Sequence, residues 1–258
     1  MRISELLSTF AQIARDNKIS EPYIVGGLPR DQAFGLSSEI KDIDITTGDK
    51  DSFALAAMSA RIWPEAHLKV YEDGHSSLRF KNINVDFSNN FKLPGITKYL
   101  KDVGINNPSD LQEEVYSRDF TINTLLQPMD LTKEPLDVTE FALNDVKNKI
   151  LRTPVDPELT IGYDPRRILR ALKLALKFDL TIAEDLQKAL IKYRGGLAEL
   201  PVNSIKRQVN QMLGIDSERT IEMLTQYKLL PIIPLSRMMN LELAKNHMVQ
   251  NLLESRYE

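Results

Sequence analysis

The chain of 258 residues contains no cysteine, which excludes disulfide bonds and metal sites built on thiolates. It has no apolar run long enough to span a membrane, so we expect no membrane partner, and the absence of cysteine fits the cytoplasmic location that we expect. Its three histidines have no spacing typical of a metal or catalytic site. The net charge of −3 and pI near 5.8 argue against nucleic-acid binding over a broad basic surface.

What the chain has is the composition of a globular protein, with 42% hydrophobic and 27% charged residues. Its length suffices for one large or two small domains. Strand-like and helical patterns mix up to about residue 150, and the pattern is helical throughout from about Pro165. We therefore predict an α+β fold, with a mixed-sheet domain over 1–150 and a helical region with a short helical C-terminal segment over 151–258.

The periodicity of apolar residues predicts the individual elements. The expected strands are Pro22–Val25, Ile40–Thr46, Leu68–Tyr71, Ser76–Phe80, Ile83–Ser88 and Ile150–Arg152. The expected helices of the first domain are Met1–Asn17, Asp31–Phe34, Ser52–Arg61 and Thr121–Leu126.

The most informative feature is a pair of aspartates, Asp42 and Asp44, in the segment KDIDITT. In a strand the alternation puts both carboxylates on one face and the apolar side chains on the other. Two adjacent carboxylates repel each other unless a cation lies between them, and oxygen ligands of this kind suit Mg²⁺. The alternative is a solvent-exposed strand face that carries two aspartates for solubility.

A glycine turn precedes the pair. The short apolar strand Tyr23–Val25 leads directly into Gly26 and Gly27, and Arg30 follows within one turn. Paired glycines allow a sharp turn and a close approach of backbone N–H groups to a ligand. An arginine at this point is suited to a two-pronged contact with phosphate. The order of turn, arginine and carboxylates is that expected for a site that binds a metal-bound triphosphate.

Four motifs resemble those of the class II nucleotidyltransferases, the family of tRNA CCA-adding enzymes and bacterial poly(A) polymerases. In chain order they are YIVGGLPRDQAFGLSSEIKDIDITT, SRDFTINTLL, EPLDVTEFALNDVKNKILRTP and YDPRRILRALKLALKF. The resemblance covers roughly residues 23 to 178 and fades after about residue 210. It implies a nucleotidyltransferase head domain followed by a helical neck.

The resemblance also implies a reaction and its ligands. The RNA 3′-hydroxyl attacks the α-phosphorus of ATP or CTP, with two Mg²⁺ ions, one of them on Asp42 and Asp44. Asp86 is the candidate third carboxylate, since it lies on the polar side of the strand pattern INVDFS, although a solvent-facing aspartate explains that pattern nearly as well. The leading substrate is the tRNA 3′ end.

The second motif supplies Arg118, Asp119 and Asn123 as further nucleotide-binding residues. Arg118 is suited to phosphate, and Asp119 to accepting a hydrogen bond from a ribose hydroxyl. In isolation, Asp119 or Thr121 is better explained as the cap of the following helix. The family match favours nucleotide contact.

The fourth motif adds Asp164, Arg167 and Arg170. Asp164 before a proline has the form of a helix N-cap. Arg167 heads an apolar stripe, so we expect it to lie inward with Asp164 as its partner, while Arg166 faces solvent. By resemblance, Asp164 and Arg167 select the incoming base. Tyr163 is a departure, because the family has glutamate there.

The sequence leaves several questions open. Ten Lys and Arg side chains against five acids between Asp164 and Asn210 are explained equally well by RNA contact and by a solvated helical face. Poly(A) addition or other RNA tailing is an alternative to CCA addition, and a non-catalytic nucleotide- or RNA-binding module is a third possibility. The oligomeric state is unknown.

Overall fold

A computed structural model describes residues 2–36, 39–80 and 82–233. Its contacts divide the chain into two units, and each is described by itself. Unit 1 comprises Met1–Asn148 and Arg152–Val155, and unit 2 comprises Lys149–Leu151 and the chain from Asp156 onward. The expected division into domains at residue 150 stays a prediction.

Unit 1 is built on a six-stranded sheet of order β3-β4-β5-β2-β1-β6. Its strands are β1 (Tyr23–Val25), β2 (Asp42–Thr46), β3 (His67–Val70), β4 (Ser76–Arg79), β5 (Asn84–Phe87) and β6 (Gln127–Pro128). The central strands β2 and β5 are parallel, while the other neighbours are antiparallel. The parallel register sets Asp44 opposite Asp86.

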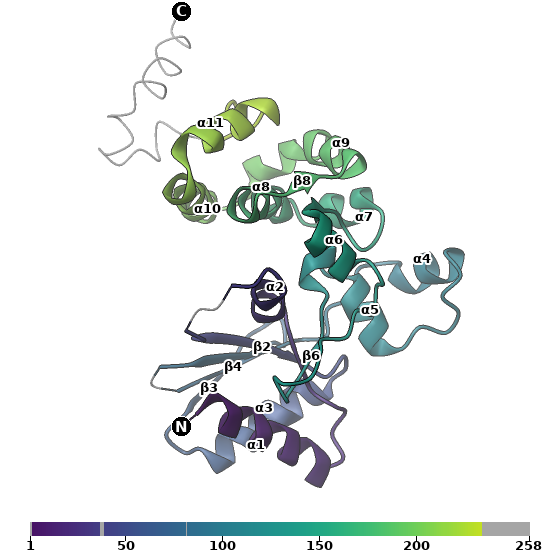
Figure 1. Ribbon diagram of the computed structural model, residues 1–258, viewed down its shortest axis with the longest axis vertical. Coiled ribbons are helices and arrows are strands. Elements are labelled where there is room, and N and C mark those ends of the chain that lie inside the picture. The colour runs from purple at the N-terminus through teal and green to yellow at the C-terminus, as the bar shows by residue number, and fades with distance from the viewer. Residues whose placement is uncertain (1, 37–38, 81, 234–258) are drawn as a thin grey trace, which may run out of the picture. The chain divides into compact units, whose positions relative to one another are not determined.

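Two helices, α1 (Ile3–Asp16) and α3 (Asp51–Ile62), pack on one face of this sheet, and α2 (Gly27–Ala33) lies on the other side (Figure 1). Ile43 and Ile45 of β2 are buried in the core that α1 and α3 cover. Phe10 of α1 meets the rings of Trp63 and Phe87 edge to face. One face of β2 is therefore fixed in the core, and its opposite face is available for polar side chains.

The rest of unit 1 consists of short helices: α4 (Ile96–Asp102), α5 (Asp110–Tyr116), the 3-10 helix η1 (Thr121–Asn123) and α6 (Ala142–Asn148). A capping box starts α5, because the Ser109 hydroxyl accepts from the N–H of Gln112 and the Gln112 side chain accepts from the N–H of Ser109. Val115 of α5 packs with Val25 and Leu126. This contact anchors the second motif beside β1.

Unit 2 is mainly helical. Its elements are β7 (Ile150–Leu151), α7 (Pro157–Tyr163), α8 (Arg166–Phe178), β8 (Thr181–Ile182), α9 (Glu184–Lys192), the 3-10 helix η2 (Arg194–Glu199), α10 (Val202–Ile215) and α11 (Ser217–Gln226). The apolar face of α8 is buried, and α10 packs against this helix. The left-handed residue Asp179 ends α8 and leads into β8, which pairs with β7 in parallel.

The predicted α+β class, with a mixed sheet followed by helices, is confirmed. Two details are wrong. The chain beyond Pro165 is not helical throughout, because β8 pairs with a strand that lies far upstream in sequence. Thr121–Leu126 forms only a three-residue 3-10 helix, after which the chain turns into β6. The part of the expected C-terminal helical segment that falls on residues 234–258 lies outside those described. No helix among the described residues is long and apolar enough to cross a membrane.

Candidate active site

Carboxylates line the open face of the two parallel strands. Asp42 and Asp44 are exposed on β2, while Ile43 and Ile45 between and after them are buried. Asp86 of β5 lies in register with Asp44 and is half-buried, with Oδ2 accepting from Asn84 Nδ2 at 2.9 Å. Residues opposite each other in neighbouring strands point to the same face, so these three aspartates share one side of the sheet.

The turn after β1 brings the backbone against one of these carboxylates. Gly26 has φ +76°, and a Cβ added to it would lie 2.9 Å from Oδ2 of Asp44. The backbone conformation thus favours glycine, and a Cβ at this position would displace the Asp44 carboxylate. Gly27 starts α2, and a Cβ there would meet only the Arg30 guanidinium, at an ordinary contact distance of 3.6 Å.

A hydrogen-bonded chain links the first motif to the second. Nη1 of Arg30 donates to Oδ1 of Asn123 at 2.8 Å, and Nδ2 of Asn123 donates to Oδ1 of Asp119 at 2.8 Å. Asp119 is only 5% exposed, and the same Oδ1 also accepts from the N–H of Phe120. The structure therefore places these predicted residues together, with Asp119 acting as the local anchor. Its contact with ribose stays a prediction.

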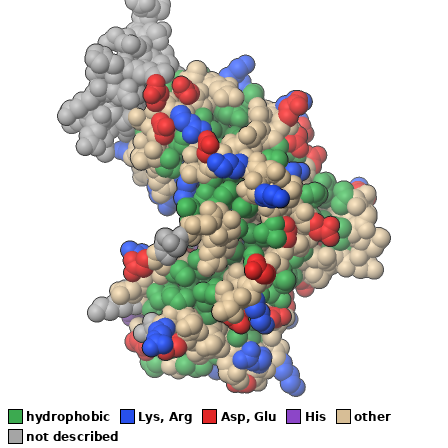
Figure 2. Space-filling model, in the orientation of Figure 1, with side chains coloured by type: hydrophobic (Ala, Val, Ile, Leu, Met, Phe, Trp, Pro, Cys, Tyr) green, Lys and Arg blue, Asp and Glu red, His purple; other side chains and the backbone are tan. Residues whose placement is uncertain are grey.

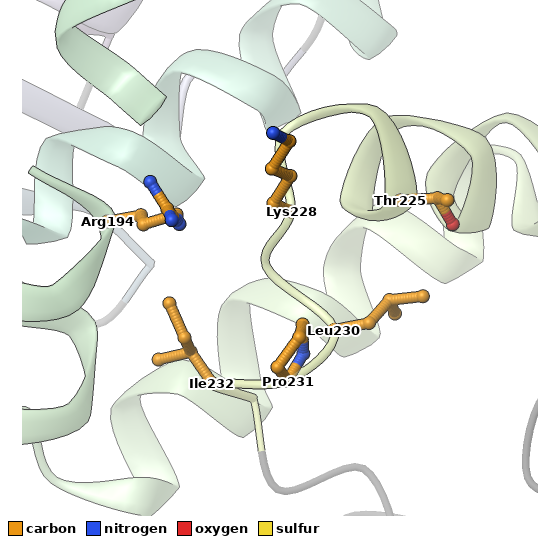
Figure 3. A pocket seen from close by; sticks show the side chains of 6 residues that line it. All are labelled: Arg194, Thr225, Lys228, Leu230, Pro231 and Ile232. Atoms are coloured by element: carbon orange, nitrogen blue, oxygen red, sulfur yellow. The ribbon is translucent and has the colours of Figure 1, made fainter. Parts of the chain in front are cut away.

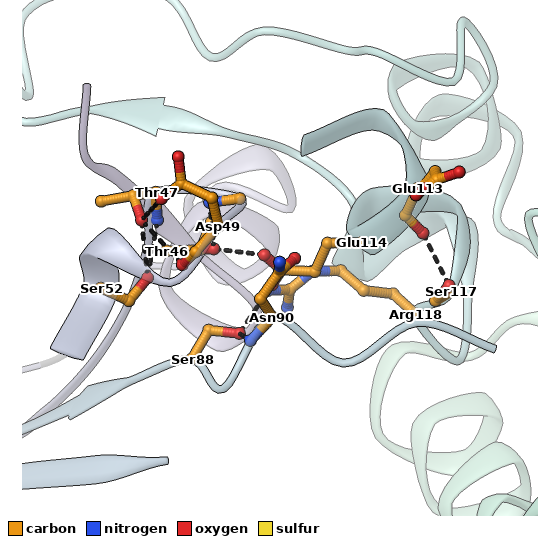
Figure 4. Close-up of polar contacts among 11 residues, drawn as sticks. Thr46, Thr47, Asp49, Ser52, Ser88, Asn90, Glu113, Glu114, Ser117 and Arg118 are labelled. Carbon is orange, nitrogen blue, oxygen red and sulfur yellow. Dashed lines mark hydrogen bonds and ion pairs between the residues drawn. The ribbon is translucent and has the colours of Figure 1, made fainter. Parts of the chain in front are cut away.

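Arg118 is held by a residue that the sequence reasoning missed. Its Nη2 donates to Oε1 of Glu114 at 2.9 Å, and Glu114 is only 3% exposed (Figure 4). The same carboxylate accepts from the hydroxyls of Thr46 and Ser88. The spacing from Glu114 to Arg118 is the i, i+4 spacing of a helical ion pair, so the sequence carried a signal for this contact.

The donor set fits a hard divalent cation. Mg²⁺ uses one or two protein carboxylates and completes its shell with water and phosphate oxygens. Asp42 and Asp44 provide such a pair on a rigid strand, and the glycine at position 26 leaves room beside Asp44. In the described part of the chain, no group of three or more His, Asp or Glu side chains is placed to hold a metal. The fit thus rests on the pair, and participation of Asp86 stays a prediction.

In unit 2, Asp164 at the start of α8 bonds to an arginine that the sequence reasoning did not pair with it. Oδ1 of Asp164 accepts from the backbone N–H of Arg166 at 3.0 Å and from its Nε at 2.7 Å. This hydrogen bond raises the pKa of Arg166. The expected Asp164–Arg167 pair stays a prediction. Arg167 is 7% exposed and Arg166 faces solvent, as expected. The nucleotide-binding roles of Asp164, Arg167 and Arg170 stay predictions.

Some basic residues of unit 2 are matched by acids. Lys188 pairs with Glu184, and Lys192 with Glu158. On the face shown in Figure 2, blue and red side chains are interspersed rather than gathered by sign. The local excess of positive charge expected from the sequence is therefore partly neutralised within the protein.

A cavity of about 550 Å³ lies elsewhere in unit 2 (Figure 3). Its lining residues are Arg194, Thr225, Lys228, Leu230, Pro231 and Ile232. None of the residues predicted to bind nucleotide belongs to this lining.

Comparison with known proteins agrees with these motifs. A CCA-adding enzyme of Leuconostoc mesenteroides is 25% identical over 218 residues, covering 83% of this chain and 51% of the relative. An A-adding tRNA nucleotidyltransferase of Aquifex aeolicus is 29% identical over 218 residues, covering 80% of this chain and 24% of the relative. The chain thus spans about half of the first relative and a quarter of the second.

The fold is also similar to that of a solved structure described as a tRNA-processing enzyme with CTP. The TM-score is 0.66 at 26% identity, and the match covers 87% of this chain and 57% of the other. The family model for the poly(A) polymerase head domain matches residues 22–152, which include β1 to β7 and every motif residue described above in unit 1. Because this match extends over half of the chain, the protein belongs to the poly(A) polymerase head-domain family.

Proposed function

We propose that this protein is a Mg²⁺-dependent nucleotidyltransferase that adds ribonucleotides to an RNA 3′ end, with the CCA end of tRNA as the leading substrate. The observation that carries the proposal is the exposed carboxylate pair of Asp42 and Asp44, with Gly26 packed against the second of them. Relatives described as CCA-adding and A-adding enzymes support the reaction class.

The proposed roles follow from the positions of the side chains. Asp42 and Asp44 would hold the metal, which supplies charge neutralisation on the triphosphate and a lowered pKa of the attacking hydroxyl when bound. Arg30 and Arg118, each fixed by a hydrogen-bonded partner, would bind triphosphate oxygens. Asn123 keeps Arg30 and Asp119 in one arrangement.

The bond changes are those of phosphoryl transfer. The 3′-oxygen of the RNA forms a bond to the α-phosphorus, the bond from that phosphorus to the bridging oxygen breaks, and pyrophosphate leaves. Such a reaction depends mainly on positioning and on stabilising charge. The rigid strand that carries the two carboxylates, together with the two hydrogen-bonded arginines, supports a role in positioning and in stabilising charge.

The proposal is tested by incorporation of labelled ATP and CTP into RNA. The substrates should include tRNA lacking its last one, two or three residues, together with unrelated RNA. We expect Mg²⁺-dependent extension of the shortened tRNAs. Extension of any RNA with ATP alone would favour poly(A) addition instead, and nucleotide binding without incorporation would favour a non-catalytic module.

Substitutions assign the chemistry to the carboxylates. Asp42→Asn and Asp44→Asn should each abolish incorporation, because each removes a metal ligand while nearly preserving side-chain shape. Asp102→Asn is a suitable control, since Asp102 is exposed at the end of α4. All three variants should keep the wild-type melting temperature. Substantial activity in either strand variant would sink the assignment.

A further inference from the structure

The buried carboxylate of Glu114 lies at a junction of three segments. Oε1 accepts from Ser88 Oγ and from Arg118 Nη2, each at 2.9 Å, and Oε2 accepts from the Thr46 hydroxyl. The two hydroxyls are themselves fixed, because Thr46 accepts from the N–H of Gly48 and Ser88 from the N–H of Asn90. Each oxygen of the carboxylate is thus engaged (Figure 4).

The contacts of Glu114 reach the last residue of β2 and the residue that directly follows β5, the two strands that carry the candidate catalytic carboxylates. Thr46 is two residues after Asp44 on β2, and Ser88 is two residues after Asp86. Residues two apart in a strand share a face and lie about 7 Å apart. Glu114 therefore holds Arg118 near the sheet face that carries Asp44 and Asp86, two residues further along the chain than these aspartates.

The guanidinium of Arg118 has one fixed contact and a further buried donor. Its side chain is 19% exposed, and Glu114 is its ion-pair partner. Among the described residues, no acceptor bonds to its buried Nε. A buried donor of this kind favours a ligand oxygen or water nearby. The arrangement is typical of an arginine held in place to meet an anion.

We propose that Glu114 is a positioning residue that orients Arg118 toward the triphosphate. This inference rests on the proposed function, in which Arg118 binds nucleotide. Glu114 itself touches no substrate in this account. Its negative charge and its two hydroxyl contacts fix the guanidinium relative to the strands of Asp44 and Asp86.

The neighbouring Glu113 provides a matched control. It lies on the same helix and is 7% exposed, so it is also a buried acid. Like Glu114, its carboxylate accepts from a cation and from a hydroxyl, here Lys92 Nζ at 2.6 Å and the hydroxyl of Thr97. It has no bond to Arg118 among the described contacts. Glu113→Gln and Glu114→Gln should therefore lower the melting temperature to a similar degree, yet differ in their kinetics.

The test measures kcat and KM for nucleotide incorporation, equilibrium ATP binding and melting temperature. Glu114→Gln should lose about 10- to 100-fold in kcat/KM, the range expected for a hydrogen bond to a charged group. Glu113→Gln should keep the wild-type value. In the Arg118→Ala background, Glu114→Gln should cause no further loss, because both changes remove the same oriented guanidinium.

Three outcomes overturn the inference. The first is a wild-type kcat/KM in Glu114→Gln. The second is a loss of kcat/KM on Glu114→Gln that is equal in the wild-type and Arg118→Ala backgrounds. Either result leaves the proposed function intact. The third is a wild-type protein that neither binds nor incorporates nucleotide, which overturns the proposed function as well. If Glu114→Gln does not fold, Ser88→Ala removes one bond to the same carboxylate. It should show a smaller loss in kcat/KM, and no loss would contradict the inference.

Discussion

Replacing Gly26 with alanine should separate the fold from the chemistry. The residue has φ +76° and ψ −120°, a conformation that side chains other than hydrogen strongly disfavour. Forcing alanine into it costs about 1–3 kcal/mol of stability. The new Cβ would also lie 2.9 Å from Oδ2 of Asp44. A carboxylate at the end of a side chain rotates away more easily than the backbone moves. The contact with the new Cβ should therefore displace the proposed metal ligand Asp44 and have little effect on stability.

The expected activity loss follows from that displacement. A shift of about 1 Å in a reacting or ligating group costs on the order of 100-fold in rate. Gly26→Ala should therefore show reduced incorporation and a higher Mg²⁺ concentration for half-maximal rate. Urea unfolding measures the stability cost, and a Mg²⁺ titration of incorporation measures the effect on the ligand.

Gly35→Ala is the matched control for this variant. Gly35 also has positive φ, +71°, but a Cβ there would meet nothing within 4 Å. It should lose about 1–2 kcal/mol through backbone strain alone and keep its Mg²⁺ dependence. If both variants show the same incorporation rate and the same Mg²⁺ dependence, the proposed link between Gly26 and Asp44 is refuted.

Two further predictions concern base choice and pH. Arg167→Ala should weaken the discrimination between CTP and ATP by about 1–3 kcal/mol. Arg166→Ala removes an exposed ion pair worth about 0–1 kcal/mol and should leave the ratio of CTP to ATP incorporation unchanged. An unaltered incorporation ratio in a stably folded Arg167→Ala variant would refute the role of Arg167 in base choice. Burial and the neighbouring Glu21 raise the pKa of Tyr23 to about 12. Since the unfolded chain ionises near 10, stability should fall as pH rises from 10 to 12, and urea unfolding of Tyr23→Phe should show a shallower fall.

The elements that the sequence predicted best are those whose pattern is local. Strand β2 alternates buried and exposed side chains over five residues, and its bounds agree with the prediction to within two residues. Helices α4 to α6 were missed, because each has only seven residues, too few for an apolar period to stand out. Strands β6 and β8 have two residues each, and they exist only through partners that are distant in sequence.

The candidate site divides in the same way. The carboxylate pair and the glycine turn could be predicted from the sequence, because each lies within one short segment. The link from Arg30 to Asn123 spans 93 positions, and that from Thr46 to Glu114 spans 68, so no local pattern contains them. The contact of Asp164 with Arg166 was not predicted for a different reason. Helical spacing gives the side of a helix, but it does not decide which of two adjacent arginines bonds to the capping carboxylate.

The path of the chain between the two units has a practical consequence for dividing the protein. The chain leaves unit 1 after Asn148, supplies β7 to unit 2, and returns to unit 1 for Arg152–Val155. Arg152 pairs with the fully buried Asp145, and Val155 belongs to the core around Leu93. A protease or a gene truncation that cuts between 151 and 152 would strip unit 1 of these contacts, whereas a cut after 155 would take the partner of β8 from unit 2. No single cut in this stretch releases both units intact.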